Sequence, residues 1–560
     1  MILKNKELSM TACIYFHPEG YSTNVEKLMG RHAAGESFLE GYFQHSAFEG
    51  PIYVHVDEQK HSDIFESTAR SYNRTENIEA IVKNQLGNLR KPGTLHLPGP
   101  ALSEQALRRS LYGNDQWSLT GITHTTSSST AMDSISGLLV NPVQPWDALI
   151  CTSNAVKRNV EVVIDANMDY LKNRLGASNF SLPQLPVIPL GINTGNFSYT
   201  EDDKVLAKKA LNVDPESIVV LYVGRLSFHA KAHPLPMYKA LEIAAKSSDK
   251  DIVLVECGWH ANEYIENAFI DCAALGCPSV KVIRLDGREA RNRKIAWAGS
   301  DVFCSLSDNI QETFGIVPIE AMSAGLPVVV SDWDGYKETV RNDIDGFRIP
   351  TIAPSPGLGG DLAHRHALGI DTYDMYCGHS SSLVSVDIAA AANAFHQLFI
   401  SPELRKKMGA AGKSRAIETY DWREIIKRYE ELWSELSSIR KNAQAEYQGQ
   451  VKNPWPARLD PTIAFAHYPT SHMTDETMLG LACPRSEFTE SDLANLKNLK
   501  MISYANYIFP TENEIATVLT NASDEMQPVR QILRGIEPSR RPYVLRGLVW
   551  LAKIGVLRTS

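Results

Sequence analysis

Two glutamates on either side of a glycine-containing turn are the strongest chemical signal in the sequence. Seven residues separate Glu312 from Glu320, and the run Thr313-Phe314-Gly315-Ile316 lies between them. The following residues, PIEAMSAG, predict a helix whose first backbone N–H groups are free to bind an anion. Glu320 inside that helix can accept hydrogen bonds from ribose hydroxyls, and Glu312 from those of a sugar. The alternative is an acid that favours the helix dipole and a surface glutamate.

A second signal follows the apolar run SIVVLYVGRL. Gly224 ends the predicted strand, Arg225 stands at its tip, and Lys231 lies six residues further on. A planar guanidinium fork and a compact ammonium charge suit the oxygens of a diphosphate. Taken alone, two cations after a strand are more often a solvated face. The two cations indicate a diphosphate site only when they are considered together with the two glutamates.

Apolar runs predict the elements that position these side chains. Runs of this length between amphipathic stretches are typical of buried parallel strands in βα units. Two series of them predict two doubly wound α/β sheets divided near 193–202, with a ligand cleft between the carboxyl ends of their strands. The first series is 12–16, 51–56, 94–99, 119–125, 147–153 and 185–192, and the second is 217–226, 251–258, 279–287, 300–306, 325–332 and 345–350.

These motifs together resemble family 4 glycosyltransferases with the GT-B fold. The resemblance covers roughly residues 10–436 and is carried by the E-x7-E region from SDVFCSL to DGFRIP, VGRLSFHAK, LPVIPLGINTGNF and DALICTSNAVK. It implies a Rossmann-like acceptor-binding domain over 1–195, completed by a crossover helix over 422–436. It implies a second Rossmann-like domain over 196–421 that binds a nucleotide-diphosphate sugar. The implied reaction is transfer of the sugar, a hexosyl group, to a hydroxyl acceptor with retention of anomeric configuration.

The resemblance also assigns roles to individual residues. Arg225 and Lys231, after Gly224, would neutralise the charge that grows on the leaving diphosphate. Glu320 would hold the ribose and Glu312 the donor sugar. The backbone N–H groups beside the sugar and phosphate would be those of Phe314, Gly315 and Ile316.

Two further site residues come from the first half of the chain. His124, in LTGITHTTSSS, matches the family's histidine at a strand tip and would contact the 6-position of the donor sugar or the substrate. A structural histidine at a strand end is the alternative. Gly35, in RHAAGESF, is similar to the glycine turn that opens the family's first helix, and Gly30 competes for that role. Small residues there let a phosphate or sugar approach the backbone.

No metal or other cofactor is expected. Asp332-Trp333-Asp334 has the D-x-D form that some transferases use for a metal, but it follows a strand at the family's loop position. Arg225 and Lys231 also reduce the need for a divalent ion. The histidines of the segment 351–385 lack regular ligand spacing and are interpreted as loop residues: His364, His366 and His379.

Composition narrows the class of protein. The chain has a net charge of −9 and a pI near 6.0, which argues against a nucleic-acid binder. The eight cysteines form no C-x-x-C pair, so we expect a reducing compartment, the cytoplasm. The first ten residues are polar and charged and no run of 18 apolar residues occurs, so neither a signal peptide nor a membrane span is expected.

Three segments depart from the alternating pattern. Residues 351–385 are rich in Gly, Pro, Ser and His and predict a long functional or mobile loop, and 437–462 predicts a linker. Residues 463–560 predict a small, mainly helical extension, weakly similar to a winged helix and basic over 528–560. Self-association is our first interpretation of it. Contact with the inner membrane face, which suits a lipid-linked acceptor, is second, and DNA binding is last.

The sequence leaves several alternatives open. Another GT-B enzyme, such as a sugar-nucleotide epimerase, fits the same fold, whereas a phosphorylase would need a pyridoxal-binding lysine context. A non-catalytic interaction protein on a GT-B scaffold is the alternative from another class. Donor base, sugar and acceptor are not determined, and the acceptor can be a glycan, a lipid-linked molecule or a small molecule. Polysaccharide or glycoconjugate biosynthesis is the expected setting.

Overall fold

The computed structural model describes residues 11–22, 30–444, 453–484, 486–487 and 489–559. Contacts divide the chain into two compact units, Met1–Trp455 and Pro456–Ser560, which are described separately below. Among the helices so described, none combines the length and the apolar character needed to cross a bilayer.

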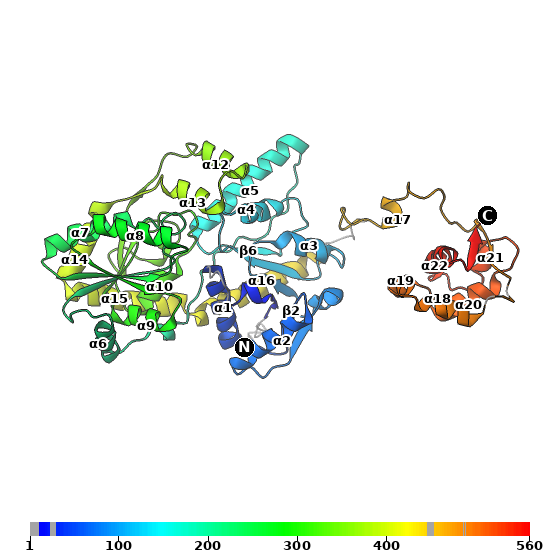
Figure 1. Ribbon diagram of the computed structural model, residues 1–560, viewed down its shortest axis with the longest axis horizontal. Helices are drawn as coiled ribbons and strands as arrows, with labels where there is room; N and C mark the ends of the chain where they lie inside the picture. The colour runs from blue at the N-terminus through cyan, green and yellow to red at the C-terminus, as the bar shows by residue number, and fades with distance from the viewer. Residues whose placement is uncertain (1–10, 23–29, 445–452, 485, 488, 560) are drawn as a thin grey trace, which may run out of the picture. The chain divides into compact units, whose positions relative to one another are not determined.

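The first half of the first unit is built around a six-stranded parallel sheet with the strand order β3-β2-β1-β4-β5-β6. Figure 1 shows this part of the chain in blue and cyan. Its strands are β1 (Cys13–Tyr15), β2 (Ile52–His55), β3 (Ile78–Ile81), β4 (Thr94–His96), β5 (Ser118–Ile122) and β6 (Ala148–Ile150). Its helices are α1 (Gly30–His45), α2 (Gln59–Ser71), α3 (Leu102–Ser110), α4 (Ser129–Gly137) and α5 (Asn154–Leu175).

A second six-stranded parallel sheet follows in the order β12-β11-β10-β7-β8-β9. In each sheet the strand order therefore reverses between the first and the fourth strand in the chain. Parallel α/β sheets bind ligands at such a point, beyond the carboxyl ends of the strands. Its strands are β7 (Ile218–Val223), β8 (Ile252–Gly258), β9 (Lys281–Asp286), β10 (Val302–Ser305), β11 (Val328–Ser331) and β12 (Gly346–Ile349). Its helices are α6 (Glu201–Ala210), α7 (Leu235–Ser248), α8 (Glu263–Gly276), α9 (Ala290–Gly299), α10 (Ile316–Ser323), α11 (Tyr336–Thr339), α14 (Ile388–Ile400) and α15 (Pro402–Arg415). The two sheets confirm the expected GT-B architecture.

Two strand predictions differ from the structure. The run 185–192 forms only isolated bridges, at Val187 and Ile192, instead of a strand. Prolines at 183, 186 and 189 remove the N–H groups that a strand ladder requires. Conversely, β3 forms at the edge of the first sheet from IEAI, a segment too polar to stand out in the sequence.

The segment 351–385 is not the long loop that its composition predicts. It contains β13 (Thr351–Ile352), α12 (Gly360–Ala367), α13 (Tyr373–Ser381) and β14 (Ser385–Val386). The antiparallel pairing of β13 with β14 closes the two ends of the segment, and Thr372 caps α13 by accepting the N–H of Met375. We call residues 353–384 the insert.

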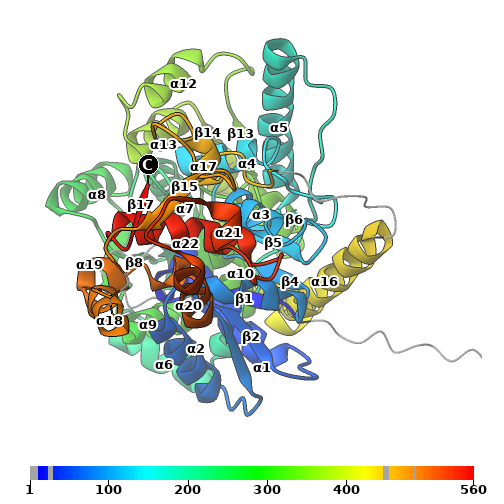
Figure 2. The same cartoon turned by 90° about the vertical axis from the view of Figure 1, so that its right-hand side faces the viewer.

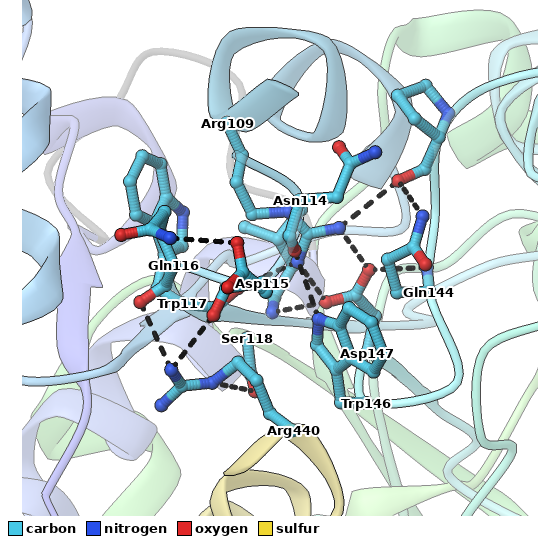
Figure 3. Close-up of polar contacts among 12 residues, drawn as sticks. Arg109, Asn114, Asp115, Gln116, Trp117, Ser118, Gln144, Trp146, Asp147 and Arg440 are labelled. Carbon is cyan, nitrogen blue, oxygen red and sulfur yellow. Dashed lines mark hydrogen bonds and ion pairs between the residues drawn. The ribbon is translucent and has the colours of Figure 1, made fainter. Parts of the chain in front are cut away.

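The crossover helix α16 (Trp422–Gln444) returns to the first sheet and contacts α1. A Cβ added to Gly41 or Gly191 would lie 2.5 Å from the Trp422 ring, so only glycine leaves room for the indole. Residues 437–444, expected in the linker, continue this helix because Arg440 anchors it. The Arg440 guanidinium donates to the carbonyls of Asp115 and Gln116 (Figure 3) and also to that of Gly93.

A buried ion pair supports that anchor. The Arg109 guanidinium forms a bidentate pair with the Asp147 carboxylate at 2.6 and 2.7 Å, and both side chains are fully buried (Figure 3). The same carboxylate accepts the backbone N–H of Leu119 on β5. Charges removed from water are retained only when paired in this way, so the pair ties α3, β5 and the start of β6 together.

The second unit is a small, mainly helical module, as expected (Figure 2). It has its own core and a three-stranded antiparallel sheet in the order β16-β15-β17. The apolar residues Val544, Leu548 and Leu551 of its last helix are buried in that core. The elements are α17 (Pro461–Ala464), β15 (Met478–Leu481), α18 (Glu490–Asn498), α19 (Lys500–Ser503), α20 (Glu512–Asn521), β16 (Gln527–Pro528), α21 (Val529–Ile532), α22 (Arg541–Lys553) and β17 (Leu557–Thr559).

Candidate active site

The loops after β7 and β10 meet where the second sheet reverses direction. Gly224 directly follows β7 and has a φ of +150°, a conformation that favours glycine. The guanidinium of Arg225, the next residue, donates to the Ala230 carbonyl at 2.9 Å and to Gln311 Oε1 at 3.2 Å. The two segments that the sequence singled out for chemistry are therefore in contact.

Lys231 and Glu312 form the central contact of this site. The Lys231 Nζ lies 2.5 Å from Glu312 Oε2, and the two side chains are 26% and 10% exposed. Burial opposes ionisation of Glu312, but Lys231 and the backbone N–H groups of Thr313 and Phe314 outweigh it and hold the pKa of Glu312 below its usual value. Glu312 is therefore an anion paired with a predicted diphosphate-binding cation.

The predicted turn and helix after Glu312 are confirmed. Gly315 has a φ of +77° and precedes α10, which begins at Ile316. A Cβ on Gly315 would lie 1.8 Å from the Tyr336 ring, so conformation and space both require glycine. Phe314 is buried beneath the turn.

Glu320 lies in α10, where the charges of Lys231 and Arg293 act on it. Burial raises the pKa of Glu320 to about 7, and the positive charges of Arg293 and Lys231 offset part of that rise. Lys231 thus acts electrostatically on both glutamates of the motif. Arg293, on α9, is a basic residue that the sequence did not single out, because it lies in a run of charged residues typical of a surface helix.

In the first domain, Gly35 and His124 line one small pocket. His96 at the end of β4 and Trp422 and Tyr429 of α16 complete its wall. Gly35 does not open the first helix as expected, because α1 begins at Gly30 and Gly35 lies inside it. Its need for glycine is steric, since a Cβ there would lie 2.0 Å from the Gly20 carbonyl oxygen.

The two domains touch beside Glu312. The Thr313 hydroxyl donates to the His124 carbonyl at 3.2 Å. From the loop before α5, the Ser153 hydroxyl lies 3.0 Å from the Thr313 carbonyl and 3.3 Å from Asp334 Oδ1. The backbone of His124 therefore lies next to the residue that follows Glu312. The connecting residue Ser153 was not predicted, because nothing distinguishes a serine after a strand.

The D-x-D residues take separate partners. Asp332 lies 3.5 Å from the Arg348 guanidinium, whereas Asp334 faces Ser153. Burial, helped by the nearby Glu312 charge, raises the pKa of Asp334 to about 8. Asp334 also has a left-handed φ of +42°, which a non-glycine residue adopts at a cost.

The three histidines of the insert do not converge. His366 stacks on Tyr376 with ring centres 4.1 Å apart, and His379 lies 3.2 Å from Asp371. His364 is on the exposed side of α12. Within the described ranges, no group of three or more His, Cys, Asp or Glu side chains is arranged to hold a metal ion.

Comparison with known proteins finds similarity in the second domain. Residues 203–354 match the family model described as Glycosyl transferases group 1. An uncharacterized glycosyltransferase of Methanocaldococcus jannaschii is 28% identical over 176 residues, 31% of this chain and 43% of that protein. A sulfoquinovosyl transferase of Arabidopsis thaliana is 28% identical over 179 residues, 31% of each chain. The chain thus spans less than half the length of these two curated relatives.

Among solved structures, Anabaena HepE in complex with UDP is similar, with 14% identity and a TM-score of 0.49. The match covers 76% of this chain and 100% of that one. The family match contains every predicted site residue of the second domain, from Gly224 to Glu320. The glycosyltransferase resemblance is therefore confirmed for this domain, while the assignment to family 4 stays a prediction.

Proposed function

We propose that the protein is a retaining, family 4 glycosyltransferase that moves a sugar from a nucleotide-diphosphate sugar to a hydroxyl acceptor. One observation carries the proposal: the Lys231–Glu312 pair, at 2.5 Å, joins the two chemical motifs at the reversal point of a sheet that matches a glycosyltransferase family. The setting we propose is glycan or glycoconjugate synthesis in the cytoplasm.

Donor binding would rearrange this pair. A diphosphate brings more negative charge than one carboxylate, so it competes with Glu312 for Lys231 and adds Arg225 as a second partner. Glu312, released from the lysine, is then available to sugar hydroxyls. Because its pKa is about 7, Glu320 can accept hydrogen bonds from ribose hydroxyls when ionised and donate one to them when protonated.

The transfer step forms a bond between the acceptor oxygen and the anomeric carbon and breaks the bond between that carbon and the phosphate oxygen. The nucleoside diphosphate leaves with the electron pair and takes the acceptor's proton. Arg225 and Lys231 stabilise the growing phosphate charge. Attack from the face that the phosphate leaves retains the anomeric configuration.

In this proposal His124 contacts the 6-position of the donor sugar or the substrate, and Gly35, which lines the same pocket, lets the sugar or phosphate of the donor approach the backbone. The two fixed cations take the part that a divalent ion plays elsewhere. We therefore expect turnover to be unchanged by a chelator.

The test is Lys231→Ala with Lys239→Ala as control, since Lys239 is exposed on α7. UDP, GDP, ADP and CMP and their sugars are screened by thermal shift, because a ligand of the folded state raises Tm. We expect one nucleoside diphosphate to stabilise the wild type and the control, and Lys231→Ala to lose most of that shift and most donor turnover.

Full donor turnover in a folded Lys231→Ala protein would remove this mechanism. If a folded wild type responds to no nucleotide, the transferase proposal fails and the interaction protein on the same scaffold takes its place.

A further inference from the structure

Tyr373 of the insert contacts the first domain. The hydroxyl of Tyr373, the first residue of α13, lies 3.3 Å from Thr125 Oγ1 and 3.2 Å from Ser127 Oγ. These two oxygens are themselves 3.1 Å apart. The three hydroxyls form a closed triangle, which we call the hydroxyl triangle. Both views show α13 next to α4, whose preceding loop carries Thr125 and Ser127 (Figures 1 and 2).

The same helix also packs on the loop between Arg225 and Lys231. The Asp374 carboxylate lies 4.0 Å from His229 Nε2. Gly378 packs so closely on His229 that a Cβ there would lie 2.9 Å from the histidine Cβ. The His229 carbonyl accepts the Asn309 side-chain amide at 3.0 Å, which joins this loop to the segment before Glu312.

These contacts put α13 between two parts of the proposed active site. On one side is the loop that carries the proposed diphosphate cations, and on the other is the residue that follows His124. The contact to the second loop is made by neutral groups, the hydroxyl triangle and the adjoining Cys377 thiol, and neutral hydrogen bonds are each worth only about 1 kcal/mol. The contact is therefore strong enough to order a loop and weak enough to break when substrate enters.

We infer that Tyr373 is a positioning residue that holds the insert against the loop of His124 and thereby closes the acceptor side of the site to water. The inference rests on the proposed function. Water competes with the acceptor hydroxyl for the donor sugar, so a transferase gains from a wall that excludes it until the acceptor is bound. The hydroxyl triangle supplies the attachment of that wall.

The test measures hydrolysis of the donor in the absence of acceptor. UDP-glucose, GDP-mannose and ADP-glucose are incubated with the full chain, and release of nucleoside diphosphate is followed. We expect Tyr373→Phe to hydrolyse the donor several times faster than the wild type, while its affinity for the nucleoside diphosphate is unchanged. Loss of structure would lower hydrolysis, so an increase separates positioning from damage.

Two further variants sharpen the result. Ser127→Ala removes two edges of the hydroxyl triangle from the first domain and is expected to raise hydrolysis in the same way, with no further rise in the double variant. Tyr376→Phe, one turn further along α13 and stacked on His366, is the matched control and should equal the wild type.

Hydrolysis in Tyr373→Phe and Ser127→Ala that equals or falls below the wild-type rate, with nucleotide binding intact, would overturn the role of Tyr373 and leave the proposed function standing. A wild type that neither binds nor cleaves any of the nucleotides would overturn both.

Discussion

At the scale of residues, the acids around the site divide into two protonation states. Glu312 is paired with Lys231 and has a lowered pKa, whereas burial raises the pKa of Glu320 to about 7 and of Asp334 to about 8. Near neutral pH, Glu312 is therefore an anion and Asp334 is mostly protonated. Opposite shifts in neighbouring carboxyl groups fit different roles, one as a charge and the others as hydrogen-bonding groups.

The state of Asp334 predicts a pH dependence of stability. Between the unfolded pKa, about 3.9, and the folded value of about 8, only the folded chain keeps this proton, so stability falls as pH rises. Asp334→Asn removes that dependence and tolerates the left-handed backbone. We expect the Tm of the variant, minus that of the wild type, to increase between about pH 5 and pH 8.

The measurement is calorimetry across that pH range, with Asp343→Asn as control. Asp343 is also left-handed, with a φ of +62°, but it is exposed to solvent. A Tm difference for Asp334→Asn that stays constant with pH would show that its carboxyl is ionised in the folded protein.

At the scale of elements, the site depends on strand ends and on one returning helix. The tips of β7 and β10 place Arg225, Lys231 and Glu312 together. Helix α16 closes the pocket of Gly35 and His124 through Trp422 and Tyr429. Its far end is held by Arg440, whose guanidinium donates to carbonyls in the loop before β5 and to the carbonyl of Gly93, the residue before β4.

That anchor predicts the effect of Arg440→Met. The change keeps an unbranched side chain but removes the guanidinium's hydrogen bonds to three backbone carbonyls, and a hydrogen bond to a charged group is worth about 1.5–3 kcal/mol. We expect faster amide hydrogen exchange in residues 437–444 and a lower urea midpoint. Arg423→Met, on the exposed face of the same helix, should leave both unchanged. Equal exchange in the two variants would show that packing alone holds the end of the helix.

At the scale of the whole molecule, the two units have separate cores. The cores of the first unit contain residues 12–436, and that of the second contains residues 479–557. Every predicted site residue lies in the first unit. The apolar residues Val544, Leu548 and Leu551 of α22 are buried in the core of its own unit, and membrane contact through this unit stays a prediction. Self-association through the second unit stays a prediction.

Separate cores predict that the first unit folds alone. A chain ending at Trp455 keeps the hydrogen bond from the Ser110 hydroxyl to the Pro454 carbonyl, at 2.9 Å, and the whole of α16. We expect it to be monodisperse and to show the same thermal shift with nucleoside diphosphate as the full chain. Aggregation, or a lost shift, would assign the second unit a part in folding or binding.

Local sequence patterns were enough to predict much of the fold and part of the candidate site. Strand-length apolar runs predicted two parallel sheets, because such runs are buried wherever they lie. The Gly315 turn, the helix after it and the cations after Gly224 were also predictable, because turn chemistry and strand ends depend on neighbouring residues. The prolines at 183, 186 and 189 also indicated that 185–192 forms no regular strand, because proline lacks the N–H that a strand ladder requires.

Tertiary structure alone decided the rest. That Thr313 meets His124, that Ser153 meets Asp334 and that Tyr373 meets Ser127 depends on how distant segments pack, and no local pattern encodes such pairs. The protonation states of Glu320 and Asp334 follow from burial, which exists only in the folded chain. Tertiary packing also decided the role of Gly35. Its neighbours in the sequence suggested a glycine that opens a helix, whereas the folded chain requires glycine there because the backbone of Gly20 approaches closely.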